Sequence, residues 1–172
     1  MRPEFSRLID LRQLGEAPQR IGATREECAA LATRFELSSV VRLEASVTFA
    51  QEGAAILVSG RLRAEVVQSC AISGEPLAVQ IDEPLALRFV PARPAPAVAE
   101  IELAGEELDE IEFQGSAFDL GEAVAQSLAL AIDPYATGPQ AEKVRAAGLF
   151  GDEVAGPFAV LAGLKTPTPA SR

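Results

Sequence analysis

The sequence predicts an α+β fold in which an antiparallel β-meander packs with a few α-helices. Apolar and polar residues alternate over three long stretches between residues 40 and 90, with the two-residue period of half-buried strands. Short turn sequences join these stretches, as in a meander. Helical patterns stand before and after the strands rather than between them, which favours α+β over an alternating α/β fold.

A helix is expected to begin after Thr24. Thr24 and Glu27 have the spacing of a capping box, in which two side chains satisfy free amides of the first turn. Apolar residues then recur at i, i+3, i+4 and i+7, which places them on one helical face. We interpret Cys28 as a small buried hydrophobic residue of that face. The face consists of Cys28, Leu31, Ala32 and Phe35.

Three strands are expected at residues 41–49, 56–66 and 77–89. The turns between them are "QEGA" at 51–54 and "SGEP" at 73–76, since glycine adopts positive φ readily. The Pro/Ala-rich stretch 91–98 cannot continue a central strand and is expected to be a linker. The residues expected to face the core are Val41, Leu43, Ala45, Val47, Phe49, Ile56, Val58, Leu62, Ala64, Val66, Leu77, Val79, Ile81, Leu85, Leu87 and Phe89.

The acidic charge is concentrated in the second part of the chain. The net charge is −10; residues 1–65 have nine basic and nine acidic side chains, and residues 66–172 have six and sixteen. Residues 100–112 include seven Asp or Glu and no Lys or Arg. Such a surface disfavours unaided nucleic-acid binding and suits a basic partner, or else the run is a solvated loop. Ile111 and Phe113 alternate with acidic residues and predict a short edge strand.

The segment "FDLGEAVAQSLALAIDPY" (118–135) predicts a second helix. Asp119 and Glu122 repeat the capping-box spacing, and Asp133-Pro134 ends the helix. The two carboxylates could alternatively form an acid/base pair or bind Mg²⁺, but capping already explains their spacing. A short helix is expected at 139–148. The stripe that covers the sheet is Leu120, Val124, Leu128 and Ile132.

Composition excludes several classes of function. The chain has no histidine, the commonest general acid/base and metal ligand, which weighs against an enzyme. No apolar run approaches about 18 residues, and the amino end lacks the order of a secretory signal, so we expect neither a membrane span nor secretion. Two cysteines form no disulfide framework, which favours a reduced, cytoplasmic protein.

The segment "CAISGEP" (70–76) has the form of half a metal motif. Ser73 stands where a second cysteine would complete C-x-x-C. One thiolate without any imidazole cannot complete a tetrahedral zinc shell, so we expect no metal and no other cofactor. Cys70 is expected to be a structural thiol with an ordinary pKa, in a turn where Glu75 accepts backbone amides.

The combination of "CAISGEP" and "FDLGEAVAQSLALAIDPY" resembles the YceD family, whose members have a C-x-x-C or C-x-x-x-x-E-P element and an "IDLGE"-type helix. The ends "EFSRLIDLRQL" and "PFAVLAGLK" resemble its alpha-proteobacterial branch. Some relatives have a second cysteine pair, which together with C-x-x-C would form a four-thiolate zinc site; this chain has no cysteine after Cys70. The matching residues are Cys70, Glu75, Pro76, Asp119, Leu120, Gly121, Glu122, Gln126, Asp133, Pro134 and Tyr135.

The resemblance implies a cytoplasmic factor required for accumulation of large-subunit (23S-type) ribosomal RNA, with no catalytic residue. We therefore expect a non-enzymatic accessory factor whose partner is the pre-ribosomal large-subunit particle, with no DNA partner. The alternative is a chaperone or adaptor for one basic ribosomal protein; a carboxylate-dependent nuclease is a third hypothesis. Arg61 and Arg63 share a strand face, with Arg42 across the hairpin, and are candidate RNA contacts.

The expected organisation is one domain over residues 1–150, with the linker and acidic loop at about 91–110, and a tail over 151–172. The tail contains a short apolar segment in which Phe158, Leu161 and Leu164 recur at three-residue steps. About nine residues cannot form an independent helix. The segment is therefore expected to dock on a partner or, equally, to fold back on its own sheet.

Overall fold

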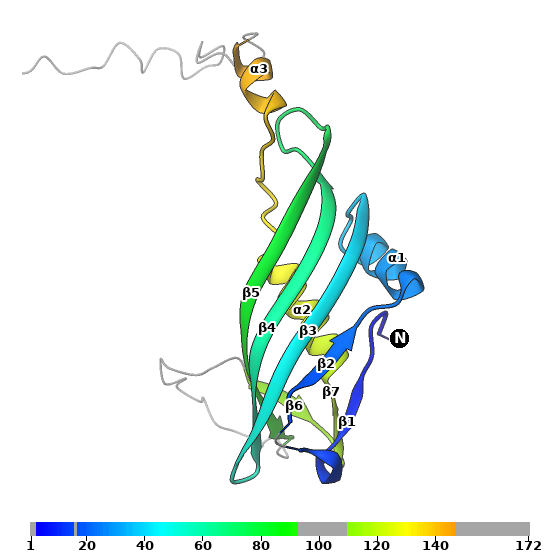
Figure 1. Ribbon diagram of the computed structural model, residues 1–172, viewed down its shortest axis with the longest axis vertical. Coiled ribbons are helices and arrows are strands. Elements are labelled where there is room, and N and C mark those ends of the chain that lie inside the picture. Colours follow the sequence, from blue (N-terminus) through cyan, green and yellow to red (C-terminus); the bar gives the residue numbers. More distant parts are fainter. Residues whose placement is uncertain (1–2, 16, 93–109, 147–172) are drawn as a thin grey trace, which may run out of the picture.

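A five-stranded sheet forms the frame of the molecule (Figure 1). The computed structural model describes residues 3–15, 17–92 and 110–146. Strands β3 (Ser39–Glu52), β4 (Ala55–Ser69) and β5 (Pro76–Pro91) are long, antiparallel and joined by tight turns. These are the three predicted strands, and the α+β meander is confirmed. The predicted turns contain Gly53 and Gly74, both at positive φ.

Two short strands extend the meander at its edges. β2 (Gln19–Gly22) pairs antiparallel with β3, and β6 (Glu110–Phe113) pairs parallel with β5, giving the order β2-β3-β4-β5-β6. The edge strand predicted from Ile111 and Phe113 is therefore present. β1 (Leu8–Asp10) and β7 (Ala117–Asp119) form a separate antiparallel pair. The sequence patterns did not predict β1, β2 or β7, because three or four residues are too few to show a period.

Three α-helices and one 3₁₀ turn complete the described part. α1 (Arg25–Arg34) packs beside β3, and α2 (Leu120–Ala131) crosses one face of the sheet, as Figure 1 shows. α3 (Gln140–Ala146) lies beyond the turn between β4 and β5, and the 3₁₀ turn η1 spans Leu11–Gln13. Thr24 and Glu27 form the full predicted capping box at α1. Cys28 is buried, as predicted.

The core lies between α1, α2 and the inner face of the sheet. Leu120, Val124 and Leu128 of α2 are all 0 % exposed, as their four-residue spacing predicts. Burying each such side chain contributes roughly 1.5–3 kcal/mol. Phe118 of β7 stacks on Phe89 of β5 with ring centroids 4.2 Å apart, and Phe113 of β6 lies 6.1 Å from Phe118. These rings attach the short strands to the long sheet.

Val41 is the one predicted inward residue that the structure places clearly outside. Val41 is 57 % exposed, whereas Val40 is 6 % exposed. The β3–β4 register shifts between Val40 and Arg42, so a β-bulge moves Val41 out of the alternation. A bulge inserts one extra residue into a strand and leaves no mark in the composition. The sequence prediction extended the two-residue period from Leu43 back to Val41 and therefore placed Val41 on the wrong face.

Candidate functional site

The motif segment at the start of α2 holds the amino-terminal segment in place. The Asp119 carboxylate caps α2 by accepting a hydrogen bond from the Glu122 amide at 3.2 Å. It also accepts the Ser6 hydroxyl at 2.6 Å and the Arg7 amide at 2.8 Å. One carboxylate therefore satisfies the helix end and fixes a segment more than 100 positions away in the chain.

Gly121 allows this close approach. A Cβ atom at Gly121 would lie 2.7 Å from both the Arg7 amide nitrogen and the Phe5 carbonyl oxygen. Real Cβ atoms essentially never come within 3.0 Å of other heavy atoms. The glycine is thus required by its packing against the backbone of the amino-terminal segment.

Glu122 forms only half of the predicted capping box. Its carboxylate accepts two hydrogen bonds from the Arg34 guanidinium, at 2.7 and 2.9 Å, instead of reaching back to the cap. Arg34 also contacts Glu4 at 2.8 Å, so this cluster joins α1, α2 and the amino-terminal segment. The Arg34 hydrogen bonds lower the pKa of Glu122. Asp119 and Glu122 are therefore both held by protein contacts, which favours a structural role over an acid/base pair or a metal site.

Cys70 lies at the centre of a second junction, at the turn between β4 and β5. Its sulfur accepts the backbone amides of Ser73 and Gly138, each at 3.4 Å. The Ala71 amide donates to the Ala136 carbonyl at 3.0 Å, and the Gln68 side chain donates to the Asp133 carbonyl at 2.7 Å. The "DPY" segment after α2 is thereby fastened to the "CAISGEP" turn.

The structure corrects the expected pKa of Cys70, and it shows that Glu75 accepts a turn amide through its backbone carbonyl. Hydrogen bonds from Ser73, and then from Gly138 and Ile72, lower the pKa of Cys70 to about 6, so the thiol is not ordinary. The amides are accepted by the Cys70 sulfur and by the Glu75 backbone carbonyl, which takes the Cys70 amide at 2.8 Å. Within the described residues, no hydrogen bond reaches the Glu75 carboxylate. Backbone amides that converge on one sulfur cannot be read from a sequence, because their donors carry no side-chain signature.

The residues at this turn do not fit a zinc ion. Within residues 3–15, 17–92 and 110–146, no group of three or more His, Cys, Asp or Glu could hold a metal. Cys28, the other thiol, is buried in the core on α1, and burial raises its pKa.

The remaining motif residues near this turn lie at the surface or at a strand start. Tyr135 is 81 % exposed, and Asp133 and Pro134 are exposed as well. Pro76 begins β5.

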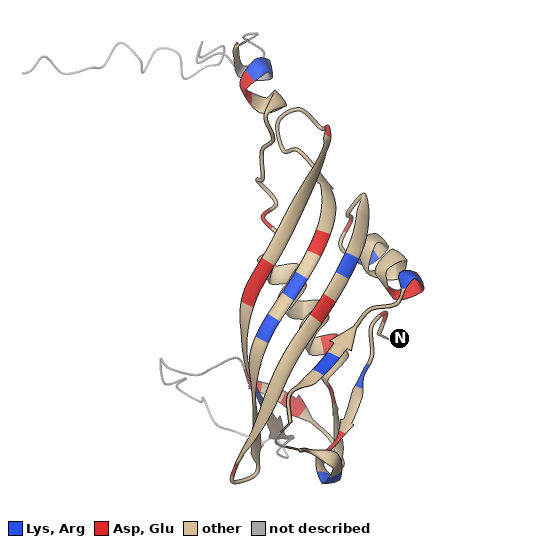
Figure 2. Ribbon diagram, in the orientation of Figure 1, with Lys and Arg blue, Asp and Glu red and all other residues tan. Residues whose placement is uncertain are grey.

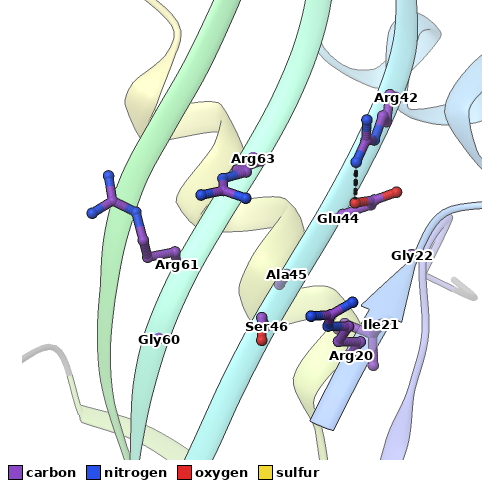
Figure 3. Close-up of a pocket in the computed structure, with 10 residues that line it drawn as sticks. All are labelled: Arg20, Ile21, Gly22, Arg42, Glu44, Ala45, Ser46, Gly60, Arg61 and Arg63. Carbon is purple, nitrogen blue, oxygen red and sulfur yellow. Dashed lines mark hydrogen bonds and ion pairs between the residues drawn. The ribbon is translucent and has the colours of Figure 1, made fainter. Parts of the chain in front are cut away.

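Basic and acidic positions are interspersed along β3, β4 and β5 (Figure 2), and the predicted arginines project from the outer face of the sheet, with α2 behind it (Figure 3). Arg61 and Arg63 are on β4, and Arg42 is on β3, so all three share this face. They are paired with carboxylates. Asp82 on β5 lies 2.8 Å from Arg61 and 3.5 Å from Arg63, and Glu44 pairs with Arg42. The Arg61 hydrogen bond lowers the pKa of Asp82, and that of Arg42 lowers the pKa of Glu44.

An open hollow of about 680 Å³ lies among these arginines (Figure 3). Arg20 on β2 is a fourth arginine at its rim, and the sequence did not indicate it because β2 was not predicted. Ser46 and Gly60 line the hollow between the arginines. A Cβ atom at Gly60 would lie 2.1 Å from the Ser46 carbonyl oxygen, so this glycine lets β3 and β4 approach. The hollow is lined by Arg20, Ile21, Gly22, Arg42, Glu44, Ala45, Ser46, Gly60, Arg61 and Arg63.

A second hollow, of about 670 Å³, lies between α1 and the start of β3. Its lining is mainly small or apolar, including Cys28, Ala32 and Val40, with Arg25 as its one charged residue. Its polar lining consists of the hydroxyl residues Thr33, Ser38 and Ser39 besides Arg25. The outer-face hollow is therefore the stronger candidate for recognition of a charged ligand.

The site residues therefore lie in three separate places. Asp119, Gly121 and Glu122 anchor the amino-terminal segment, Cys70 and Asp133 join at the β4–β5 turn, and the arginines occupy the outer sheet face. Phe158, Leu161 and Leu164 lie outside the described residues, as does the acidic run up to residue 109.

The fold and site define a small α+β protein with two structural junctions and a basic hollow on an exposed sheet face. A family model described as "Large ribosomal RNA subunit accumulation protein YceD" matches residues 58–165. This chain belongs to the YceD family. No curated protein and no solved structure gives a significant match. Among the described residues, no helix is long and apolar enough to cross a membrane.

Proposed function

We propose that this protein is a non-enzymatic accessory factor that supports accumulation of large-subunit (23S) ribosomal RNA in the cytoplasm. The family itself is defined by large-subunit ribosomal RNA accumulation. The observation that supports an accessory role best is that the carboxylates of the motif segment are engaged in structural contacts. Asp119 holds Ser6 and Arg7, and Glu122 holds Arg34.

The charge distribution favours action within a particle rather than tight binding to free RNA. The chain has a net charge of −10, which repels phosphates at long range. Arg42, Arg61 and Arg63 nevertheless share one exposed face, where they could contact ribosomal RNA locally. Contacts with ribosomal proteins would supply the remaining affinity. The proposed partner is the pre-ribosomal large-subunit particle.

Depletion of the protein tests this function. The ratio of large- to small-subunit ribosomal RNA is expected to fall in depleted cells and to recover when the wild-type chain is supplied. A variant with Asp119→Asn and Glu122→Gln serves as a control for catalysis. If this variant folds as the wild type does, it should restore the RNA ratio. If the folded variant fails to restore the ratio and only the wild type succeeds, the nuclease hypothesis is favoured.

The alternative is a chaperone or adaptor for one basic ribosomal protein of the large subunit. The net charge of −10 favours such a partner. Co-purification separates the two functions. Pre-ribosomal particles in the purified material support the accessory factor, whereas one basic protein in equimolar yield without ribosomal RNA supports the adaptor.

A further inference from the structure

We propose that the outer-face hollow binds the phosphodiester backbone of RNA without reading bases, and that Asp82 and Glu44 restrain this binding. The proposal rests on the proposed function and assigns it a site. The hollow combines four arginine side chains on three neighbouring strands: Arg20 on β2, Arg42 on β3, and Arg61 and Arg63 on β4. Guanidinium groups donate paired hydrogen bonds that match phosphate geometry.

The strand register places Arg20 and Arg61 on opposite sides of Ser46, with a space between them. Arg20 and Arg61 are both aligned with Ser46, one from each side. Since neighbouring strands lie about 4.8 Å apart, their Cα atoms are about 10 Å from each other across the small Ser46 side chain. Figure 3 shows Arg20 pointing from β2 toward Ser46 on β3. Within the described residues, no ion pair involves Arg20, so its guanidinium is available to an anion.

The other arginines are held by carboxylates of the protein itself. Arg61 and Arg63 share Asp82, and Figure 3 shows Arg61 extended toward β5, away from Ser46. Arg42 is paired with Glu44. These pairs are half-exposed, with the Asp82 side chain 49 % and the Glu44 side chain 50 % exposed. Such pairs contribute little to stability, and an incoming phosphate can replace the carboxylate at small cost.

The same face lacks the groups that read bases. The described outer positions of β2 to β6 are charged, polar or aliphatic, the larger aliphatic ones including Leu57, Val67 and Val90, and none of them is an aromatic residue that could stack on a base. Sequence-tolerant single-strand binding normally depends on such stacking, whereas phosphate contacts alone carry no sequence information. We therefore infer contact with the RNA backbone that is weak, salt-dependent and indifferent to base identity.

Fluorescence anisotropy with labelled short oligouridine and oligoadenosine tests this site in the full chain at low salt. Arg20→Ala and Arg61→Ala are each expected to weaken binding about five- to tenfold and to reduce the salt slope by about 1. Asp82→Asn is expected to tighten binding about two- to fivefold, because it removes a competing negative charge. Arg12→Ala is the matched control, since Arg12 is 82 % exposed on η1 outside the hollow, and should change neither value.

Three results would overturn the proposal: no binding by the wild type, no effect of Arg20→Ala, or weaker binding by Asp82→Asn. A large difference between oligouridine and oligoadenosine would refute backbone-only contact. The cell assay separates this proposal from the proposed function. If the Arg20→Ala/Arg61→Ala double variant restores large-subunit RNA as well as the wild type, the site is wrong and the function stands. If depletion leaves that RNA unchanged, the function itself is wrong.

Discussion

Replacing Gly121 with alanine should destabilise the protein although alanine favours helices. The added Cβ atom would lie 2.7 Å from the Arg7 nitrogen and the Phe5 oxygen, against an ordinary contact of at least 3.4 Å. The amino-terminal segment would have to move by about 0.7 Å, the difference between these distances. Both obstructing atoms are backbone, so no side-chain rotation can relieve the contact.

The magnitude follows from overpacking and from the hydrogen bonds that hold this segment. Overpacking costs about 1–3 kcal/mol. The displacement also weakens three hydrogen bonds, from Ser6 and Arg7 to Asp119 and from the Leu120 amide to the Arg7 carbonyl, each contributing about 1 kcal/mol. Higher helix propensity returns at most about 1 kcal/mol. The net loss is about 2 kcal/mol, which lowers the thermal midpoint by about 4–8 °C.

Thermal and urea unfolding of Gly121→Ala beside Gly15→Ala provides the assay. A Cβ atom at Gly15 would meet nothing within 4 Å, and Gly15 is not at positive φ, so this control makes the same chemical change in open space. Its stability should stay within about 0.5 kcal/mol of the wild type. Equal or greater stability of Gly121→Ala relative to the wild type would show that the motif glycine is not required by packing.

Four further predictions concern Cys70, Glu27, metal content and the tail. In a Cys28→Ser background, the ultraviolet absorbance of the Cys70 thiolate should appear with a midpoint near pH 6, and Ser73→Ala should raise that midpoint; a midpoint at the ordinary 9.0 would refute the amide contacts. The Arg7 hydrogen bond lowers the pKa of Glu27 from 4.5 to about 2, so its stabilisation is complete above pH 4.5 and lost as the pH falls toward 2. Glu27→Gln, which retains a capping residue, should therefore be about 1 kcal/mol less stable than the wild type at neutral pH and equally stable near pH 2, as measured by urea unfolding; a constant difference would disprove the linkage. The purified protein should contain no stoichiometric zinc and keep its thermal midpoint with chelator, and one zinc per chain by elemental analysis would contradict this. If the segment with Phe158, Leu161 and Leu164 docks on a partner, deleting residues 154–172 should abolish restoration of large-subunit RNA and keep the thermal midpoint; if it folds back on its own sheet, the midpoint should fall by several degrees.

The long elements were predictable because each repeats its period several times. β3, β4 and β5 have 14 to 16 residues, and the stripe of α2 recurs over three turns. The helix caps were also predictable where the side chain itself makes the bond, as at Thr24. At Glu122 the local prediction failed because Arg34, 88 positions away, competes for the same carboxylate.

The junctions and the hollow depend on contacts between distant segments and could not be predicted in full. The sequence identified Arg42, Arg61 and Arg63 from one strand period, but Arg20 joins them only through the pairing of β2 with β3. The lowered pKa of Cys70 depends first on the side chain and amide of Ser73, three positions away, and then on the Gly138 amide, 68 positions away. A bulge at Val41 and a close approach at Gly121 are properties of backbone geometry, which side-chain patterns record poorly.

Crosslinking of the tagged protein to RNA in growing cells tests the central claim most directly. The proposed function predicts that crosslinks are enriched on large-subunit ribosomal RNA relative to small-subunit RNA. It also predicts that ribosomal proteins of the large-subunit precursor particle are present in the same purified material. The Arg20→Ala/Arg61→Ala variant should give fewer crosslinks at equal protein level, and Arg12→Ala should match the wild type. Recovery of neither large-subunit RNA nor its precursor particles would contradict the claim that this protein acts on the assembling large subunit.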